Sequence, residues 1–149
     1  METYTAIQVA KFIVTYAMNR GNPVTPLKLQ KLLFFLWAEV FHRNGTELFT
    51  DTIYAWQFGP VVLSVYNRFC ANGGMAIRNT YDDIGINDHD ASVLSEILNR
   101  YMGFSARDLV DLTHRRGMAW DRVYRNGEGN HQSIGFNLII EHDCQNLPA

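Results

Sequence analysis

The sequence has few cysteines and no excess of positive charge. Only two of its 149 residues are cysteine, Cys70 and Cys144, and they form no CxxC pair. Two distant cysteines provide no disulfide framework, and a chain of this length buries roughly 68–70% of its unfolded surface without one. Thirteen Lys and Arg against 15 Asp and Glu give a net charge of −2. The chain as a whole is therefore not attracted to nucleic acid or to anionic membranes.

Long apolar runs are also missing. A bilayer-spanning helix needs about 20 apolar residues, whereas the longest run here, Leu32 to Val40, is interrupted by Glu39. The first residues, Met1 to Gln8, have neither the basic nor the apolar region of a signal peptide. We therefore expect a cytoplasmic protein with no membrane contact.

Motifs for catalysis, metals and phosphate are absent as well. The histidines form no HxxxH pair, and the glycine-rich segments 73–74 and 127–129 match neither a Walker A loop nor a dinucleotide fingerprint. No sequence pattern brings Cys70 or Ser64 to a histidine base. We expect no catalytic residue, no metal and no cofactor, and hence a protein that is not an enzyme.

Helical patterns fill the first part of the chain. Apolar residues at helical spacing predict an amphipathic helix from Thr5 to Arg20, ended by Gly21. Thr25 and Pro26 provide an N-cap and a first helical residue for a second helix, which Asn44 and Gly45 end. Apolar residues cover most of this second helix, so we expect it to be central.

The middle of the chain contains weaker β signals. The segment 53–58 is rich in aromatic and β-branched residues and predicts a short strand that Gly59 and Pro60 end. A third helix follows, with apolar positions from Val62 to Phe69, and a second short strand is expected near residues 81–86.

Three further helical pieces are expected in the last third. They comprise a helix through residues 93–101, a helix opened by a capping box at Ser105 and stopped by Gly117, and a short piece beginning at Trp120. Ser133 is expected to cap a final helix. The predicted fold is mainly α (α+β): a single compact helical domain, residues 1–149, of about six helices with a small antiparallel β element.

A few side chains are only partly explained by this fold. Lys28 and Lys31 flank Gln30 on the polar side of an apolar helix, so we expect their amino groups to reach the surface beside the core, as in a recognition face. Trp56, Tyr66 and Trp120 are amphipathic aromatics, which pack in cores and also anchor interfaces. The basic residues near Trp120 could contact phosphate or an acidic partner, or simply be solvated: Arg115, Arg116, Arg122 and Arg125.

These residues belong to segments that resemble the Panacea domain, also called the SocA-like domain. The two most specific stretches are TPLKLQKLLFF (residues 25–35) and AWQFGPVV (residues 55–62), and the order and spacing match across nearly the whole chain. The other matching segments are residues 9–13, Leu48 with Phe49 and Ile53, Val65 with Tyr66, and Leu112–His114 with Trp120. One departure is Ala119, because the family commonly has proline directly before this tryptophan.

The resemblance implies a non-enzymatic prokaryotic or phage-encoded antitoxin in the cytoplasm of a bacterium or phage-infected cell. Such proteins neutralise a cognate toxin protein, and in one branch deliver it to a Clp-type protease. We expect the family-like residues to form the partner-binding face: Lys28, Gln30, Lys31, Trp56, Tyr66, His114 and Trp120. Two alternatives are a protease adaptor or phage counter-defence inhibitor that binds a host defence protein, and a nucleic-acid-binding regulator that uses the four arginines; nucleic acid is the less favoured partner.

Overall fold

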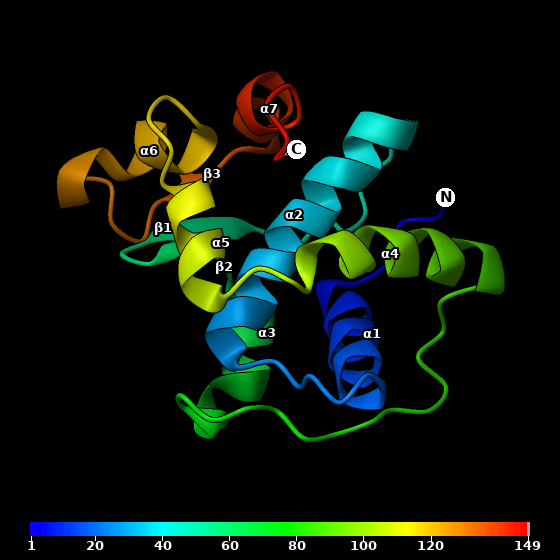
Figure 1. Ribbon diagram of the computed structural model, residues 1–149. Coiled ribbons are helices and arrows are strands. Elements are labelled where there is room, and N and C mark those ends of the chain that lie inside the picture. The colour runs from blue at the N-terminus through cyan, green and yellow to red at the C-terminus, as the bar shows by residue number, and fades with distance from the viewer. Residues whose placement is uncertain (149) are drawn as a thin grey trace.

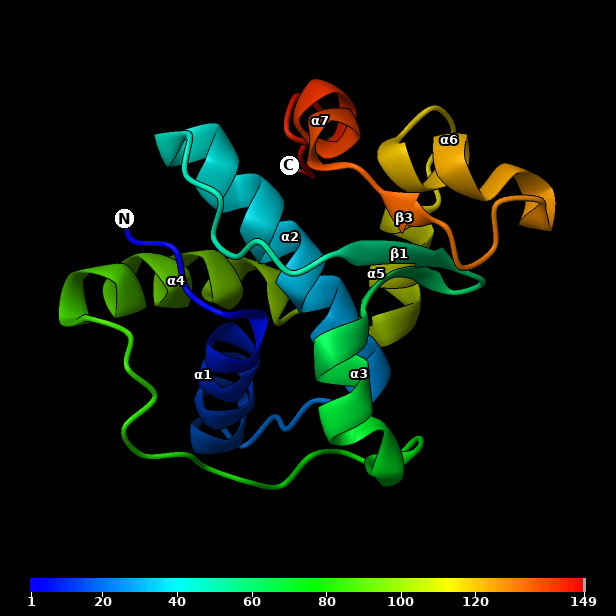
Figure 2. The same cartoon turned by 180° about the vertical axis from the view of Figure 1, so that it is seen from behind.

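Helix α2 (Pro26–Asn44) runs through the centre of the protein in the computed structural model, which describes residues 1–148 (Figures 1 and 2). The Thr25 hydroxyl caps it by accepting a hydrogen bond from the Lys28 N–H, and Gly45 ends it in the left-handed conformation (φ 66°). Every residue from Leu29 to Val40 is buried. The central position predicted for this helix is confirmed.

The other elements pack around α2. In both views, α1 (Ala6–Asn19) and α4 (Asp88–Tyr101) lie on one side of it, and the β-sheet and α6 (Ala119–Tyr124) lie on the other (Figures 1 and 2). Contacts with α2 also come from α3 (Leu63–Phe69), α5 (Ala106–Thr113) and the π-helical turn Ile139–Asp143. Short 3-10 turns follow α3 and α6, at Cys70–Asn72 and Arg125–Gly127.

The sheet has three antiparallel strands in the order β2-β1-β3. Strands β1 (Ile53–Trp56) and β2 (Gly59–Val62) form a hairpin in which Trp56 pairs with Gly59, so Gln57 and Phe58 form its turn. Strand β3 (Ser133–Ile134) pairs with the other edge of β1. The mainly α fold with a small antiparallel element is therefore confirmed.

The capping box predicted at Ser105 is confirmed, and a second one is present at Thr5. Thr5 and Ser105 both form the reciprocal side-chain and backbone hydrogen bonds of a capping box, at the first residues of α1 and α5. The helix beginning near Trp120 is α6, whose first residue is Ala119.

Four boundary predictions were wrong. Gly59 and Pro60 do not end the β structure but begin β2, where proline is tolerated because β2 is an edge strand. Residues 81–86 form no strand; this loop is tied to α1 by a hydrogen bond from the Tyr81 N–H to Thr15 Oγ1 (2.9 Å). Helix α5 ends at Thr113, before Gly117.

The fourth error concerns the last helix. Ser133 is not its cap but lies in β3, because its backbone pairs with β1. Gly135 is the N-cap of α7 (Phe136–Leu138), which continues into the π-helical turn. Residues 1–148 thus contain seven α-helices, where about six were expected.

Candidate partner-binding site

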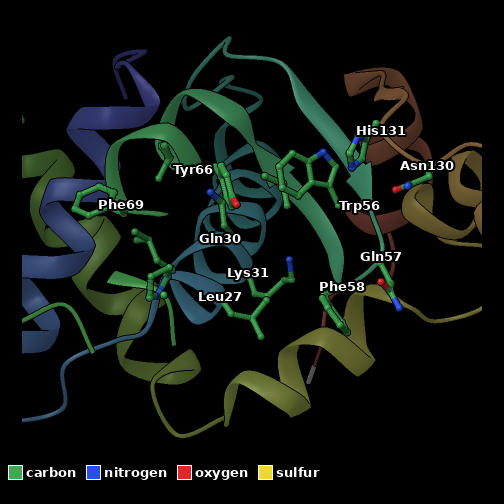
Figure 3. A pocket seen from close by; sticks show the side chains of 15 residues that line it. Leu27, Gln30, Lys31, Trp56, Gln57, Phe58, Tyr66, Phe69, Asn130 and His131 are labelled. Atoms are coloured by element: carbon green, nitrogen blue, oxygen red, sulfur yellow. The ribbon is translucent and has the colours of Figure 1, made fainter. Parts of the chain in front are cut away.

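A cavity of about 380 Å³ opens between α2, the β1–β2 hairpin, α3 and the loop before β3 (Figure 3). Four of the predicted partner-binding residues line it: Gln30, Lys31, Trp56 and Tyr66. Most of the other lining side chains are apolar, and they include Leu27, Leu29, Phe58, Val61, Val65 and Phe69. A concave apolar pocket with a few polar groups is the usual form of a ligand or anchor site.

Three large apolar side chains at this cavity are exposed to solvent. Phe58 at the hairpin turn is 58% exposed, Tyr66 on α3 is 40% exposed and Leu27 on α2 is 38% exposed. Together we call them the apolar mouth. Single exposed apolar side chains are normal on a protein surface, whereas several gathered around one cavity indicate an interaction surface.

Aromatic packing forms one wall of the cavity. The ring of Trp56 lies edge-on to Tyr66, with 4.7 Å between ring centroids, and 4.8 Å from the ring of His131. His131 has a positive φ of 69° and reaches this position because its backbone N–H donates to the Ala55 C=O. The wall is therefore built by pairing of the loop before β3 with β1.

Gln30 on α2 lines the cavity and holds the hairpin in place. Its side chain is buried; Oε1 accepts a hydrogen bond from the Val62 N–H (2.8 Å) and Nε2 donates to the Val62 C=O (3.2 Å). Both ends of the amide are thus engaged by the backbone of β2. Gln30 fixes the hairpin on α2, and these two bonds use one N–H and one lone pair of its amide.

Lys31 does not reach the surface, contrary to the prediction. Its side chain is 0% exposed, and its Nζ donates to the Pro60 C=O at 2.9 Å. The hairpin covers it, and the missing side chain of Gly59 leaves the space, because a Cβ there would lie 2.9 Å from Lys31 Cε. Within residues 1–148 no carboxylate forms an ion pair with this amine. Burial lowers the pKa of Lys31 to about 7.

Lys28 lies apart from the cavity. Its side chain is half-buried and its Nζ donates to the Met102 C=O (3.1 Å), on the side of α2 that faces α4 and α5. Burial lowers the pKa of Lys28, and the nearby Asp108 carboxylate acts in the opposite direction. The structure therefore does not bring the two predicted lysines together.

His114 and Trp120 form a stack behind the cavity wall. Their ring centroids are 3.7 Å apart and nearly parallel, and Trp120 Nε1 donates to the Trp56 C=O at 2.7 Å. Burial, followed by the charge of Lys31, lowers the pKa of His114. These two residues support the strand that carries Trp56 but do not line the cavity.

The four arginines near Trp120 are not equivalent. Arg115 is half-buried and donates to the Leu112 and Asn146 carbonyls, and Arg122 donates to the Gly117 C=O. Arg116 and Arg125 are exposed. Two of the four guanidinium groups thus hold backbone turns together.

Ala119 explains the departure from the expected proline. It is the first residue of α6, is fully buried, and its N–H donates to Asp143 Oδ1 at 2.9 Å. Burial raises the pKa of Asp143. Proline would fit the first helical position but has no N–H for this carboxylate.

Among residues 1–148, no three His, Cys, Asp or Glu side chains gather closely enough to hold a metal ion. The same part of the chain has no helix that is both long and apolar enough to cross a membrane. Both cysteines are free thiols, with Cys70 exposed and Cys144 buried.

Comparison with known proteins identifies the family. The model for the SocA-like antitoxin, Panacea domain matches residues 29–121. The chain is also 33% identical to the Antitoxin SocA of Caulobacter vibrioides (strain NA1000 / CB15N), over 149 aligned positions that cover 92% of this chain and 79% of that protein. The chain belongs to the SocA-like, Panacea-domain family. No solved structure matches it significantly.

Sequence reasoning missed part of the cavity of this Panacea domain. Phe58 could have been recognised, because an aromatic residue directly before Gly59 and Pro60 lies in a turn, where burial is difficult. Asn130 and His131 could not, since they reach the cavity only through the pairing of β1 with β3. They also lie beyond the matched residues 29–121.

Proposed function

We propose that this protein is an antitoxin that neutralises a cognate toxin by binding it directly, with the cavity and its apolar mouth as the binding site. Membership of the SocA-like antitoxin family supports the general role, since the relative in Caulobacter vibrioides bears that name. The cavity supports the direct mode of action.

The observation that carries the proposal is the exposure of the apolar mouth. Phe58, Tyr66 and Leu27 come from three different elements and surround one concavity. Large apolar side chains left in water beside a cavity gain most when a partner covers them, and aromatic residues dominate the energy of such interfaces.

The proposal is one of binding rather than catalysis. The polar atoms of Gln30 are engaged by the Val62 backbone, and the Lys31 amine donates to Pro60. The remaining wall is largely apolar. Such a lining is suited to recognising a protein surface, and we propose that no bond is made or broken there.

The test is a pull-down from the native host followed by a growth assay. Tagged wild-type protein should capture a small co-encoded protein, the toxin. The toxin expressed alone should arrest growth, and its co-expression with the tagged protein should restore growth. The double variant Phe58→Ala, Tyr66→Ala should lose both capture and rescue. Met75→Ala is the matched control, because Met75 is 73% exposed but does not line the cavity.

Other captured partners would change the conclusion. Recovery of a Clp-type protease together with the toxin, and a shorter toxin lifetime, would add an adaptor role. Recovery of a host defence protein alone would replace the antitoxin role with counter-defence. Capture and rescue by the double variant as strong as by wild type would refute the proposed site.

A further inference from the structure

The Lys31 amine at the base of the cavity has donors that the fold does not use. A lysine ammonium carries three N–H groups, and the hydrogen bond to the Pro60 C=O accounts for one of them. The charged and titratable group that bears on it from α5 is His114, which is itself basic. An ammonium with no counter-ion is costly to bury, so it is an unusual choice for the base of an apolar cavity.

The amine lies at the lining of the cavity, where the β1–β2 hairpin covers it from solvent. Figure 3 shows the Lys31 nitrogen among the lining side chains, between those of Leu27 and Phe58 on one side and Trp56 on the other. Apolar side chains of α3 and β2 complete the wall, including Val61 and Val65. The cavity therefore combines one basic amine with a surrounding apolar surface.

We propose that this cavity receives the C-terminal residue of the toxin, whose carboxylate pairs with Lys31 while its side chain packs against the apolar wall. The inference rests on the proposed function, because it names the part of the toxin that the site binds.

A chain terminus fits this combination better than an internal acidic residue. A C-terminal leucine or phenylalanine has a carboxylate and an apolar side chain on the same Cα, so one residue satisfies both parts of the cavity. An internal Asp or Glu would instead bring a peptide backbone into the apolar wall, where its N–H and C=O groups lack partners.

Pairing is favoured because the amine is already desolvated. Two charges brought together from water both lose hydration, and that loss often exceeds their attraction. Here folding has removed water from Lys31, which is 0% exposed, so binding adds mainly the desolvation of the carboxylate. A carboxylate also raises the pKa of a neighbouring amine, so binding near pH 8 takes up a proton.

Part of the β1–β2 hairpin must move before the carboxylate reaches Lys31, since the hairpin covers the amine and water does not touch it in this structure. Phe58 is the exposed, cavity-lining side chain of this hairpin and moves with its turn. It lies at the hairpin turn and is 58% exposed, so it loses little packing when it rotates away.

The first experiment uses dipeptide probes and does not require the toxin. N-acetyl-Leu-Phe with a free carboxylate is compared with its C-terminal amide at about 1 mM, the range in which weak single-site binding is detected. Binding is followed by NMR of the lysine side-chain methylenes in the full-length protein. N-acetyl-Phe-Glu with an amidated C-terminus tests the side-chain carboxylate.

The free acid should bind at least about tenfold more tightly than the amide, a difference of about 1.4 kcal/mol. It should also raise the titration midpoint of Lys31. Lys31→Met should remove the preference for the acid, and Lys11→Met, on α1 beside Tyr81, should keep it. Equal binding of acid and amide, no binding of either, or equal binding of the glutamate probe would overturn the proposal.

The second experiment separates this inference from the proposed function. The captured toxin is prepared with a short Gly-Ser extension either at its C-terminus or at its N-terminus. The C-terminal extension should weaken binding at least about tenfold, and the N-terminal one should not. Neutralisation that survives the C-terminal extension would refute the carboxylate site and leave the antitoxin function standing, whereas loss of neutralisation by every toxin form would refute the function itself.

Discussion

Replacing Lys31 by methionine should change how the stability of this protein depends on pH. Burial lowers the pKa of Lys31 in the native protein to about 7, from 10.5 in the unfolded chain. Between these values the unfolded chain holds the proton and the native protein does not. Stability therefore rises with pH in this range, because the unfolded state binds more protons.

The magnitude follows from the same two values. One extra proton on the unfolded chain gives a slope of about 1 kcal/mol per pH unit, so unfolding should cost about 2 kcal/mol more at pH 9 than at pH 7. Lys31→Met removes this titration. At pH 7 the variant should be more stable than wild type by about 1–3 kcal/mol. This is the free energy that burying the amine costs wild type, minus the free energy of the hydrogen bond to Pro60 that the variant loses.

The assay is urea unfolding followed by far-UV circular dichroism at pH 7, 8 and 9. The range stops at pH 9 because burial raises the pKa of Cys144 to about 12. The ordinary pKa of a cysteine thiol is 9.0, so at higher pH the Cys144 thiol ionises in the unfolded chain and not in the native protein. This difference lowers the stability of wild type and of Lys31→Met alike. The lowered pKa of His114 changes stability mainly below pH 6.5, the ordinary pKa of histidine, and so outside the range of pH 7 to 9.

Lys11→Met is the control, since it removes a lysine that lies over the Tyr81 ring and is only half-buried. It should keep the wild-type slope. A slope in Lys31→Met equal to that of wild type would refute the reasoning, because some other group would then carry the titration.

Three further substitutions test the packing around the cavity, each measured as a change in the free energy of unfolding. Gly59→Ala should cost about 3 kcal/mol, because Gly59 has a φ of 112° and a Cβ there would lie 2.7 Å from a threonine hydroxyl. Gln30→Leu should cost about 2–3 kcal/mol, since it leaves the buried N–H and C=O of Val62 without partners. Ala119→Pro should cost about 1–3 kcal/mol by removing the N–H that Asp143 accepts.

Matched changes check two of these mechanisms, those of Gly59→Ala and Ala119→Pro. Gly74→Ala should alter stability by less than about 0.5 kcal/mol, because a Cβ at Gly74 would meet no other atom within 4 Å and its φ is not positive. Ala119→Ser keeps the backbone N–H and should keep the bond to Asp143, although its hydroxyl needs a partner. A Gly59→Ala protein as stable as Gly74→Ala would show that the hairpin tolerates the side chain.

Signals that act within a few residues made much of the fold predictable. The hydroxyls of Thr25 and Ser105 fix helix starts by bonding to N–H groups three residues away. Gly45 fixes a helix end because its left-handed conformation is easy for glycine. Each of these contacts is complete within one turn of chain, so the sequence contains all of the relevant atoms.

The errors occurred where distant segments decide the structure. Lys31 occupies a polar position on its own helix, but β2 covers that position from 29 residues away. Ser133 has the chemistry of a helix cap, yet pairing with Tyr54 places it in a strand. Periodicity describes one element at a time, so it cannot show which face a second element will cover.

The two stretches that carry the family resemblance are in contact with each other. Gln30 bonds to Val62, and Lys31 bonds to Pro60, so residues 25–35 and 55–62 together fold the hairpin onto α2. A contact that the fold itself needs is the same whichever partner binds.

Partner choice must therefore come from other side chains. A C-terminal carboxylate is common to all proteins, so its pairing with Lys31 would provide affinity without discrimination. The apolar mouth surrounds that position and contributes little to folding because it is exposed. Substitutions at Phe58, Tyr66 and Leu27 should then change which toxin is bound while the hairpin and the base of the cavity stay unchanged.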